Sequence, residues 1–498
     1  MNAPTPDWHA RAAAVTIDGR CLINGRRVTS TNSQTFDCIS PLNGKVLGQI
    51  ARGSSADIDL AVAAARRAFN ARVWAGQSPS SRKRVLQAFA EKMLAHGDEL
   101  ALLETLDMGK PIKNSLSADV PGSANCIAWY GEAIDKVYGE IAPTGDNALA
   151  LIEREPMGVI GVIVPWNYPM LMAAWKLGPA LATGNSVVLK PSEKSPLTAL
   201  RLAELALEAG LPEGVFNVVP GFGHEAGEAL ALHMDVDAIG FTGSTRVGRK
   251  MLEYAGRSNL KRVYNELGGK SANLIFADCD DLERAAATAA GSMFYNQGES
   301  CNAPSRLFVQ DSIADDFVAQ VVAQTPAYAA GDPLDASTEL GALVDVGQMN
   351  VVLGYIEAGK NEGAKCVAGG TQMRLESGGF FVAPTVFDGC TNHMKITREE
   401  IFGPVLSIIR FKDEADGIAM ANDSPYGLNA AVWSGNLSRA HRVARALRAG
   451  TVHVNAYDED DITVPFGGYK QSGNGRDKSL HAMEKYTELK TIWIRVDQ

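Results

Sequence analysis

Short apolar runs alternate with amphipathic stretches through the middle of the chain. The first run, from Val159 to Val164, is continuously apolar, as expected of a parallel strand buried on both faces. Similar runs recur at a spacing of about 25 residues, each followed by a stretch with helical periodicity. The apolar runs are 159–164, 186–190, 215–219 and 238–242, and the helical stretches are 170–183, 196–209, 225–233 and one that begins at 245. Four such alternations predict a doubly wound, nucleotide-binding type of domain.

The same alternation starts again after Gly268. Residues 272–277 form an apolar run, 282–293 a helical stretch and 306–310 another apolar run. This restart predicts a second α/β domain. No linker rich in Pro, Gly or Ser marks the boundary between the two.

The N-terminal region predicts short strands at 21–25 and 46–50, followed by helices from Ser55, at 80–108 and at 121–137. The apolar positions that fit the period of the first helix are Ile58, Leu60, Ala61, Ala64 and Phe69. Residues 138–153 are polar and alternating, which predicts an exposed hairpin, and residues 490–494 are an apolar stretch near the C-terminus. These two segments suggest strand pairing between subunits, and we expect a homodimer or homotetramer.

Composition narrows the class of protein. A chain of 498 residues with 46% hydrophobic and 21% charged residues is expected to form two or more soluble globular domains. The net charge of −10 argues against nucleic acids and anionic membranes as partners. No apolar run approaches the roughly 20 residues of a membrane span, and the N-terminus lacks the pattern of a secretory signal. We therefore expect a cytoplasmic protein with no membrane partner.

Seven cysteines are scattered singly, which suits reduced thiols better than a disulfide framework. Neither CxxC nor HExxH occurs, so the sequence carries no zinc signature and no metal site is expected. Cys279 lies between two aspartates, whose negative charge should raise the pKa of its thiol and suppress its reactivity. Cys126 lies in a helical run and is expected in the core. Four others have no obvious activator: Cys21, Cys38, Cys366 and Cys390.

The remaining cysteine follows a polar break in the chain. The helical stretch 282–293 gives way to Tyr295-Asn296-Gln297-Gly298-Glu299-Ser300-Cys301-Asn302. A thiol at the end of a helix, in a loop that contains glycine, is open to substrate and has backbone N–H groups beside it. We interpret Cys301 as a nucleophile, although the residues alone leave a buried structural thiol open as an alternative.

Two other polar residues offer what a nucleophile needs. Glu266 precedes two glycines at the end of an apolar run, where a dry cleft would raise its pKa toward that of a general base. A salt-bridge role is the alternative. Asn167 lies between prolines in Pro165-Trp166-Asn167-Tyr168-Pro169, where its amide could serve as a preorganised oxyanion donor or simply belong to a tight turn.

Three stretches are candidates for a nucleotide site. In Phe241-Thr242-Gly243-Ser244-Thr245 a strand ends and a helix starts at once, so free N–H groups and the helix dipole face an incoming anion; a plain helix N-cap is the alternative. Lys190 and Glu193 follow the second strand at its carboxyl end, where ligands of open α/β sheets bind, or where a surface turn could lie. The third, Gly221-Phe222-Gly223-His224, is only a near miss to GxGxxG.

Together these stretches resemble the aldehyde dehydrogenase superfamily. The resemblance covers essentially the whole chain and includes Glu399-Glu400-Ile401-Phe402-Gly403-Pro404-Val405 and the run from Pro465 to Gly473. It is closest to bacterial enzymes that act on γ-glutamylaminobutyraldehyde and guanidinobutyraldehyde. The resemblance implies an α/β fold with a Rossmann-like NAD-binding domain (1–137 and 155–268), a second α/β catalytic domain (269–480) and a small β oligomerisation arm (138–154 and 481–498).

The resemblance also implies a reaction. Cys301 attacks an aldehyde, the Asn167 amide and the Cys301 backbone N–H hold the oxyanion, hydride passes to a nicotinamide, and Glu266 activates water to hydrolyse the thioester. Lys176 is implied as a further catalytic residue. Glu193 favours NAD over NADP, with use of both left open. The cofactor-binding residues implied are Ile163, Pro165, Trp166, Asn167, Lys190, Ser192, Glu193, Gly223, Phe241, Thr242, Gly243, Ser244, Val247, Leu267, Glu400 and Phe402.

The resemblance places the aldehyde between apolar walls formed by Trp175 and Phe466. The acidic run Asp458-Glu459-Asp460-Asp461 lies in the region of the substrate entrance, where it could attract an amine or guanidine, or where it could be a solvated loop. We therefore expect ω-amino, γ-glutamylamino or guanidino aldehydes as substrates. The substrate-binding residues implied are Met172, Trp175, Ser300, Asn302, Asp458 and Phe466.

Some positions depart from the family pattern. Ser300, Asn302 and Pro304 beside the nucleophile are unusual, and Asp477 stands where many relatives have Glu. The departures leave substrate choice and any proton relay through Asp477 open. Three alternatives remain: a broad-specificity aldehyde dehydrogenase, an enzyme that passes the thioester to coenzyme A, and a non-catalytic protein on the same fold.

Overall fold

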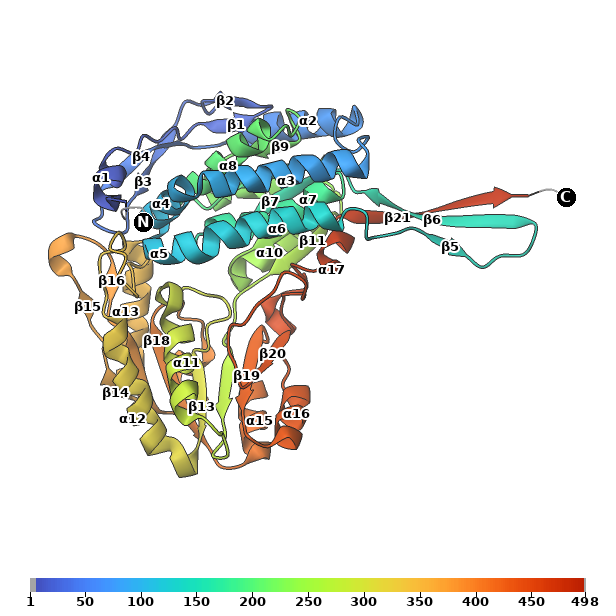
Figure 1. The fold of residues 1–498 in the computed structure, drawn as a ribbon. Coiled ribbons are helices and arrows are strands. Elements are labelled where there is room, and N and C mark those ends of the chain that lie inside the picture. Colours follow the sequence, from blue (N-terminus) through green and yellow to red (C-terminus); the bar gives the residue numbers. More distant parts are fainter. Residues whose placement is uncertain (1–5, 497–498) are drawn as a thin grey trace, which may run out of the picture.

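The computed structural model describes residues 6–496, which form two lobes and a projecting arm (Figure 1). Each lobe is built on a seven-stranded mixed sheet, here called the first and the second sheet. The arm is a three-stranded antiparallel sheet that extends from the upper lobe in Figure 1. This architecture confirms the predicted α/β class.

The first sheet contains the four apolar runs of the predicted doubly wound domain. Its order is β11-β10-β7-β8-β9-β1-β2, with parallel pairing from β11 to β9 and antiparallel pairing at β1 and β2. The strands are β1 (Cys21–Ile23), β2 (Arg26–Val28), β7 (Val159–Ile163), β8 (Ser186–Lys190), β9 (Phe216–Val218), β10 (Ala238–Thr242) and β11 (Arg262–Glu266).

Helices cover both faces of the first sheet, as the continuous apolar strands require. Along β7, Ile160 and Val162 pack into one core cluster, whereas Val159 and Ile163 pack into another on the opposite face. The helices of this lobe are α1 (Trp8–Ala13), α2 (Ser55–Asn70), α3 (Pro79–Ala95), α4 (Gly97–Met108), α5 (Ile112–Asn114), α6 (Val120–Ala133), α7 (Pro169–Ala182), α8 (Leu197–Glu208), α9 (Glu228–Leu232) and α10 (Thr245–Arg257). A separate hairpin pairs β3 (Thr35–Ile39) with β4 (Val46–Ala51).

Two details of the N-terminal prediction were wrong. The helix expected over 80–108 is two helices, because His96 has φ −101° and ψ 22° and ends α3 before α4 begins. Leu60 is not part of the buried face of α2, since it is 53% exposed. The buried face of α2 includes Ile58, Ala61 and Val62, so Leu60 lies on the solvent side.

The second sheet begins with β12, the strand that follows Gly268. Its order is β14-β17-β18-β13-β12-β19-β20, parallel except at β14. The strands are β12 (Ala272–Ile275), β13 (Arg306–Gln310), β14 (Lys365–Ala368), β17 (Thr385–Cys390), β18 (Val405–Phe411), β19 (Asn429–Trp433) and β20 (Thr451–Val454). The other elements of this part of the chain are α11 (Leu282–Phe294), α12 (Ala314–Gln324), α13 (Val346–Asn361), β15 (Gln372–Met373), β16 (Phe381–Val382), α14 (Lys395–Arg398), α15 (Glu414–Asn422), α16 (Leu437–Ala446) and α17 (His481–Glu484).

The segment after β20 returns to the first sheet. Glu266, the last residue of β11, forms an antiparallel bridge with Gly473, and Leu267 N–H donates a 2.9 Å hydrogen bond to the Ser472 carbonyl. A Cβ at Gly473 would lie 2.2 Å from the Asn265 carbonyl oxygen, and φ there is +122°, so only glycine permits this approach. The late segment 465–480 is thereby held against the carboxyl end of β11.

The arm consists of β5 (Glu140–Ala142), β6 (Ala148–Pro156) and β21 (Thr487–Arg495). The predicted hairpin is present as β5 and β6, and β21 pairs with β6 of the same chain from Thr487↔Pro156 to Arg495↔Ala148. The apolar C-terminal stretch therefore has its partner strand within the chain. Among residues 6–496, no helix is long and apolar enough to cross a membrane.

Candidate active site

The loop that carries Cys301 has an unusual backbone. After α11, three consecutive residues adopt positive φ: Asn296 (48°), Gln297 (58°) and Gly298 (70°). The side chains of Asn296 and Gln297 are almost completely buried. A non-glycine residue in this conformation costs free energy and persists only where its surroundings hold it in place.

Hydrogen bonds hold this loop against the end of the first sheet. Asn296 Nδ2 donates to the Asn167 carbonyl (3.0 Å), and Asn167 Nδ2 donates to the Glu299 carbonyl (2.8 Å). The two asparagines thus join the loop before Cys301 to the turn after β7. One N–H of the Asn167 amide is used in this contact, and the amide carries a second.

A cavity of about 230 Å³ lies between the two lobes, and Cys301 lines it. Eleven of the predicted site residues line this cavity. They come from segments far apart in the sequence, the first after β7 and the last after α14. The complete lining is Pro165, Trp166, Asn167, Met172, Thr242, Gly243, Ser244, Leu267, Gly268, Cys301, Gln348, Glu400 and Phe402.

One wall of the cavity is aromatic and acidic. The rings of Trp166 and Phe402 meet edge to face with centroids 5.1 Å apart. Glu400 accepts a 2.9 Å hydrogen bond from Gly269 N–H, while burial raises the pKa of its carboxyl to about 7. A Cβ at Gly268 would lie 2.1 Å from Glu400 Oε2, so glycine is required for this carboxylate to lie there.

The start of α10 provides the anion-binding geometry predicted from sequence. Ser244 is the N-cap, and its side chain accepts a hydrogen bond from Val247 N–H. Thr242, the last residue of β10, lines the cavity, and its hydroxyl oxygen is buried without a hydrogen-bond partner. The sequence left two alternatives for this stretch, a plain helix N-cap and a helix N-terminus open to an anion. The structure has both features, so the alternatives do not exclude each other.

Other predicted cofactor residues lie beside this cavity without lining it. Lys190 pairs in register with Ile163, and Phe241 pairs with Ile163 on the other side, so the carboxyl ends of three strands lie together. Lys190 Nζ lies 3.3 Å from Glu193 Oε2. Ser192 follows β8, Val247 packs in the core with Leu267, and Gly223 begins a turn that ends at Gly227 beside Lys190.

These features fit a dinucleotide. The helix N-terminus suits a phosphate, the aromatic wall suits a flat ring, and the Glu400 carboxylate suits ribose hydroxyls. Thr242, whose hydroxyl has no hydrogen-bond partner among the described residues, lines the cavity together with the backbone of Gly243 and Gly268.

Glu266 is buried at the end of β11, and neither carboxylate oxygen has a hydrogen-bond partner in the structure. Burial raises its pKa well above the usual range; Asp477 and Glu400 add to this, whereas Lys176 and Lys485 oppose it. A carboxylate whose pKa is raised is a stronger proton acceptor, once ionised, than an ordinary carboxylate.

Lys176 of α7 is fully buried and pairs with Asp477, whose other oxygen accepts a 2.5 Å hydrogen bond from Lys485 Nζ. Asp477 is 1% exposed. Lys176 is among the residues predicted from sequence and Asp477 among the departures from the family pattern, whereas Lys485 was not predicted.

The pKa of the Cys301 thiol is raised well above its ordinary value, first by burial and then by Glu266, Glu400 and Asp458. The thiol pKa of Cys279 is also raised, as predicted, although first by burial and only then by the charges of Asp280 and Asp281. Cys126 is buried in the core as predicted. The pKa of its thiol therefore does not distinguish Cys301 from the other cysteines. Its position in the cavity does.

The predicted substrate walls are close to each other. The rings of Trp175 and Phe466 have centroids 5.1 Å apart, and they share a core cluster with Met172 against which Cys301 packs. Ser300 Oγ lies 2.6 Å from the Tyr168 hydroxyl. This contact of Tyr168 was not predicted, although Tyr168 lies in the Trp166-Asn167-Tyr168 stretch that the sequence singled out.

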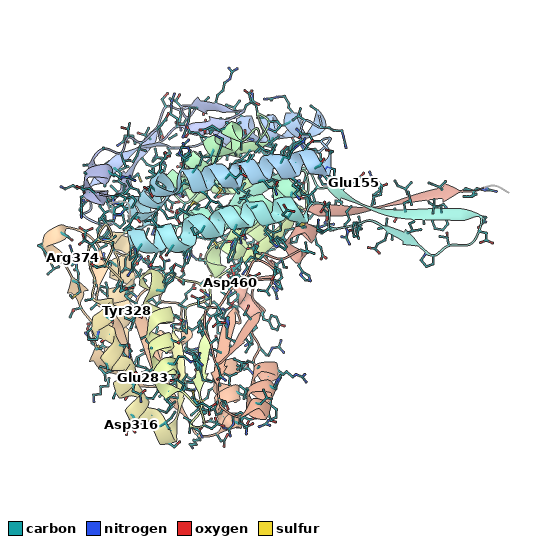
Figure 2. The ribbon with its side chains drawn as sticks, viewed as in Figure 1. Glu155, Glu283, Asp316, Tyr328, Arg374 and Asp460 are labelled. Carbon is teal, nitrogen blue, oxygen red and sulfur yellow. The ribbon has the colours of Figure 1, made fainter. Side chains whose placement is uncertain are left out.

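The acidic run is less free than its sequence suggests. Asp460 forms an ion pair with Lys478, and Asp461 accepts hydrogen bonds from the backbone and hydroxyl of Thr463. Figure 2 shows Asp460 at the junction of the two lobes. Asp458 accepts a 2.6 Å hydrogen bond from Asn302. The run therefore does not present four equivalent carboxylates to a ligand.

Gln348 is a cavity residue with no clear signal in the sequence. It lies in α13, and its Nε2 donates to the carbonyls of Ile401 (3.1 Å) and Phe402 (2.7 Å). Phe402 has φ +58°, so this side chain supports a strained turn in the cavity wall. Only the tertiary structure places it there.

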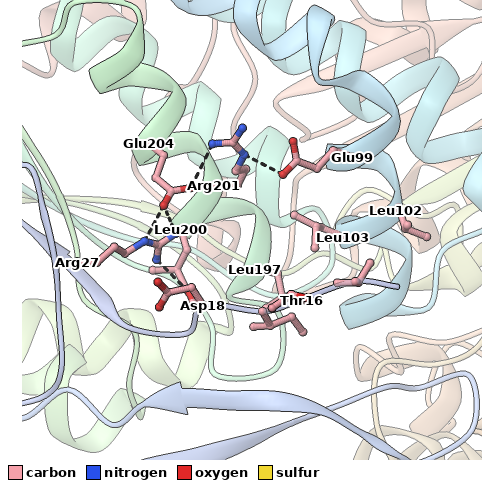
Figure 3. A pocket seen from close by; sticks show the side chains of 12 residues that line it. Thr16, Asp18, Arg27, Glu99, Leu102, Leu103, Leu197, Leu200, Arg201 and Glu204 are labelled. Atoms are coloured by element: carbon pink, nitrogen blue, oxygen red, sulfur yellow. Dashed lines mark hydrogen bonds and ion pairs between the residues drawn. The ribbon is translucent and has the colours of Figure 1, made fainter. Parts of the chain in front are cut away.

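A second cavity, of about 310 Å³, lies between residues 15–18, α4 and α8 (Figure 3). Arg201 binds Glu99 and Glu204, and Glu204 in turn binds Arg27 (2.7 Å). Arg27, Glu99, Arg201 and Glu204 satisfy one another, so we interpret this cluster as a structural link between the N-terminal segment and the helices.

Comparisons with known proteins show which family the chain belongs to. The model of the aldehyde dehydrogenase family matches residues 28–492. The NADP/NAD-dependent aldehyde dehydrogenase PuuC of Escherichia coli (strain K12) is 54% identical over 490 residues, which cover 98% of each chain.

Two solved structures are similar over nearly their whole length. The γ-glutamyl-γ-aminobutyraldehyde dehydrogenase of Burkholderia cenocepacia J2315 is 58% identical, with a TM-score of 0.97 and 99% of each chain covered. The P. syringae indole-3-acetaldehyde dehydrogenase AldA, solved as a mutant with NAD⁺ and IAA, is 56% identical, with a TM-score of 0.98 and coverage of 98% of this chain and 99% of that one. The chain therefore belongs to the aldehyde dehydrogenase family and is an NAD(P)-dependent aldehyde dehydrogenase.

Proposed function

We propose that Cys301 is the nucleophile and that its sulfur attacks the carbonyl carbon of the aldehyde. The oxyanion that forms is stabilised by the Cys301 backbone N–H and by the second N–H of the Asn167 amide, which the Glu299 carbonyl holds in place. NAD⁺, when bound, accepts the hydride that leaves the substrate carbon. The C=O bond re-forms on the enzyme as a Cys301 thioester.

Glu266 then takes a proton from a water molecule, and the oxygen of that water attacks the thioester carbon. The carbon–sulfur bond breaks, the carboxylic acid leaves, and the sulfur takes the proton back from Glu266, which restores the Cys301 thiol and the Glu266 carboxylate. The observation that carries this proposal is the buried Glu266 carboxylate with no hydrogen-bond partner, held at the end of the strand that leads to the Cys301 cavity. A carboxylate without partners can bind and deprotonate water.

We propose that the cofactor residues predicted from sequence bind NAD⁺ along a path from the carboxyl ends of the first-sheet strands to the Cys301 cavity. Lys190 and Glu193 would hold the adenosine ribose, Ser244 and the start of α10 a phosphate, and Glu400 the nicotinamide ribose. Trp166 and Phe402 would shape the nicotinamide pocket. The Glu193 carboxylate repels a 2′-phosphate, which favours NAD.

The variant Glu266→Gln tests the assignment of the base. It should retain a burst of NADH equal to the enzyme concentration and lose steady turnover, because the amide cannot take a proton from water. Rapid mixing with an aldehyde and NAD⁺ measures both phases. Equal loss of the burst and of turnover would assign Glu266 to activation of the thiol instead.

For the substrate, we propose an ω-amino, γ-glutamylamino or guanidino aldehyde. Support comes from a relative named for γ-glutamyl-γ-aminobutyraldehyde and from Asp458, whose carboxylate lies next to Asn302 beside the nucleophile. A broad-specificity enzyme for aromatic or aliphatic aldehydes is the second candidate, favoured by the Trp175–Phe466 wall and by the relative named for indole-3-acetaldehyde.

A panel of aldehydes followed by NADH absorbance separates these substrate classes. The amino aldehydes should show the highest kcat/KM, and the panel contradicts the proposal if neutral aldehydes of equal length do as well. Adding coenzyme A and searching for acyl-CoA tests the thiol-transfer alternative, which the presence of Glu266 disfavours.

We further propose that the arm assembles a homodimer or homotetramer in the cytoplasm. Its strands expose apolar side chains, including Ile141 (71%) and Trp493 (65%), and the outer edges of β5 and β21 have no partner strand in the sheet. The domain division predicted from sequence is supported by the two sheets, since β11 belongs to the first and β12 to the second.

A further inference from the structure

A buried charge cluster lies behind Glu266, and one member comes from the end of the chain. Lys176 lies on α7, Asp477 lies in the segment bound to β11, and Lys485 follows α17 directly, two residues before β21 begins. The side chains of Lys176 and Asp477 are 1% exposed and that of Lys485 is 7% exposed. Buried charges at this depth must compensate one another.

Asp477 is held by both of its oxygens. Oδ2 pairs with Lys176, and Oδ1 accepts a 2.5 Å hydrogen bond from Lys485. Burial alone would raise the pKa of Asp477, but Lys176 and Lys485 together lower it below the ordinary value. The aspartate therefore remains an anion and has no free oxygen to receive a proton from a neighbour.

Two ammonium groups and one carboxylate leave an excess of one positive charge. Glu266 is acted on by all three groups, and also by the negative charge of Glu400; its own charge in turn acts on Cys301. The cluster of Lys176, Asp477, Lys485 and Glu266 is neutral only when Glu266 is ionised. Without Lys485, the Lys176–Asp477 pair would be neutral by itself and would offer Glu266 no net compensation.

We propose that Lys485 is a positioning residue for thioester hydrolysis: it holds Asp477 as a fixed anion and supplies the positive charge against which Glu266 ionises. The proposal rests on the proposed role of Glu266 as the base. It assigns a reaction-tuning function to a residue at the root of the arm, in a segment that the sequence indicated only for subunit assembly.

The test measures hydrolysis directly. Cys301 is acylated with p-nitrophenyl acetate, which forms the acetyl thioester and releases p-nitrophenolate, and the loss of the acetyl mass from the intact enzyme is followed at several pH values. In Lys485→Gln, which keeps a hydrogen-bond donor but no charge, the pH midpoint of hydrolysis should rise by about one unit, so hydrolysis below the midpoint is about tenfold slower. Lys485→Arg should restore the wild-type midpoint.

A double variant separates the effect of charge from any effect of a single substitution on folding. Asp477→Asn with Lys485→Gln removes one charge of each sign, so the excess positive charge returns and the midpoint should move back toward that of the wild type. Lys261→Met is the matched control, because Lys261 is also buried but bonds the Ala231 carbonyl, away from this cluster.

The proposal is overturned if folded Lys485→Gln keeps the wild-type midpoint, if the double variant shifts as far as the single one, or if Lys261→Met shifts equally. Failure of the underlying function has a different signature. If Glu266→Gln hydrolyses the thioester at the wild-type rate, Glu266 is not the base, whatever Lys485 does.

Discussion

The Asn302 amide donates a 2.6 Å hydrogen bond to the Asp458 carboxylate and so links the residue after the nucleophile to the acidic run. The Tyr457 hydroxyl, from the residue just before the run, donates a 2.6 Å hydrogen bond to the Asn302 carbonyl. The neighbouring residues Tyr457 and Asp458 thus both hold Asn302. The position of Asp458 is set by this contact rather than by solvent alone.

Asp458→Asn should reduce the preference for amino aldehydes. A unit charge a few ångströms from a cationic substrate contributes about 1 kcal/mol in a wet site, so the ratio of kcat/KM for 4-aminobutanal to that for butanal should fall by about fivefold. Asp461→Asn is the matched control, because Asp461 bonds Thr463. A ratio that is unchanged in Asp458→Asn, or that falls equally in Asp461→Asn, would contradict the assignment.

Glu193→Gln should improve the use of NADP. Glu193 lies 3.3 Å from Lys190, and with the carboxylate removed, the ammonium remains to attract a 2′-phosphate. We expect the ratio of kcat/KM for NADP to that for NAD to rise by about tenfold, equivalent to about 1.4 kcal/mol. Glu193→Asp keeps the charge and should keep the ratio close to that of the wild type. Equal ratios in all three proteins would mean that Glu193 does not face the ribose.

The stability of the protein should depend on pH through Lys270. Its ammonium is buried without a hydrogen-bond partner, and burial together with Arg306 lowers its pKa to about 7. In the unfolded chain a lysine titrates near 10.4. Between these values only the unfolded chain binds the proton, so Lys270 makes the free energy of unfolding rise with pH across this window, by at most about 1.4 kcal/mol per unit.

Lys270→Met removes this titration. The free energy of unfolding of Lys270→Met minus that of the wild type should be largest below pH 7 and should decrease as the pH rises toward 10. Urea denaturation at fixed ionic strength measures this difference. Lys365→Met, at an exposed position on β14, should show a nearly constant difference. A constant difference for Lys270→Met would refute the prediction.

Charges introduced on the arm should weaken assembly. Trp493→Lys together with Ile141→Lys places cations on two exposed apolar positions of β21 and β5, and the mass measured by light scattering should fall toward that of a single chain. Leu252→Lys is the control, because Leu252 is 51% exposed on α10, outside the arm. Assembly that survives the arm variant and fails in the control would place the interface elsewhere.

Local sequence pattern was sufficient for the parallel strands. Continuous apolar runs such as that from Val159 to Ile163 became strands buried on both faces, because both faces of such a strand need apolar cover. The same reasoning misplaced Leu60, since periodicity alone does not decide on which side of a wide apolar stripe the core lies.

The pairing of charged and polar side chains could not be predicted in this way. Lys478 neutralises Asp460 and Lys485 binds Asp477, but nothing in the spacing of charges shows which lysine will be buried beside which carboxylate. Gln348 donates a hydrogen bond to the Phe402 carbonyl, although the two residues are 54 positions apart in the sequence. Such pairs depend on how two lobes and a returning segment pack, which is a property of the whole chain.

The pairing of β21 with β6 has a consequence for biosynthesis. The chain is made from its N-terminus, and domains fold as units during synthesis. Cys301, Asn167 and Glu266 therefore leave the ribosome well before Lys485 and its partner strand β21. With the roles proposed above, a nascent chain would carry the nucleophile and a base without its compensating charge until the segment of Lys485 and β21 is synthesised.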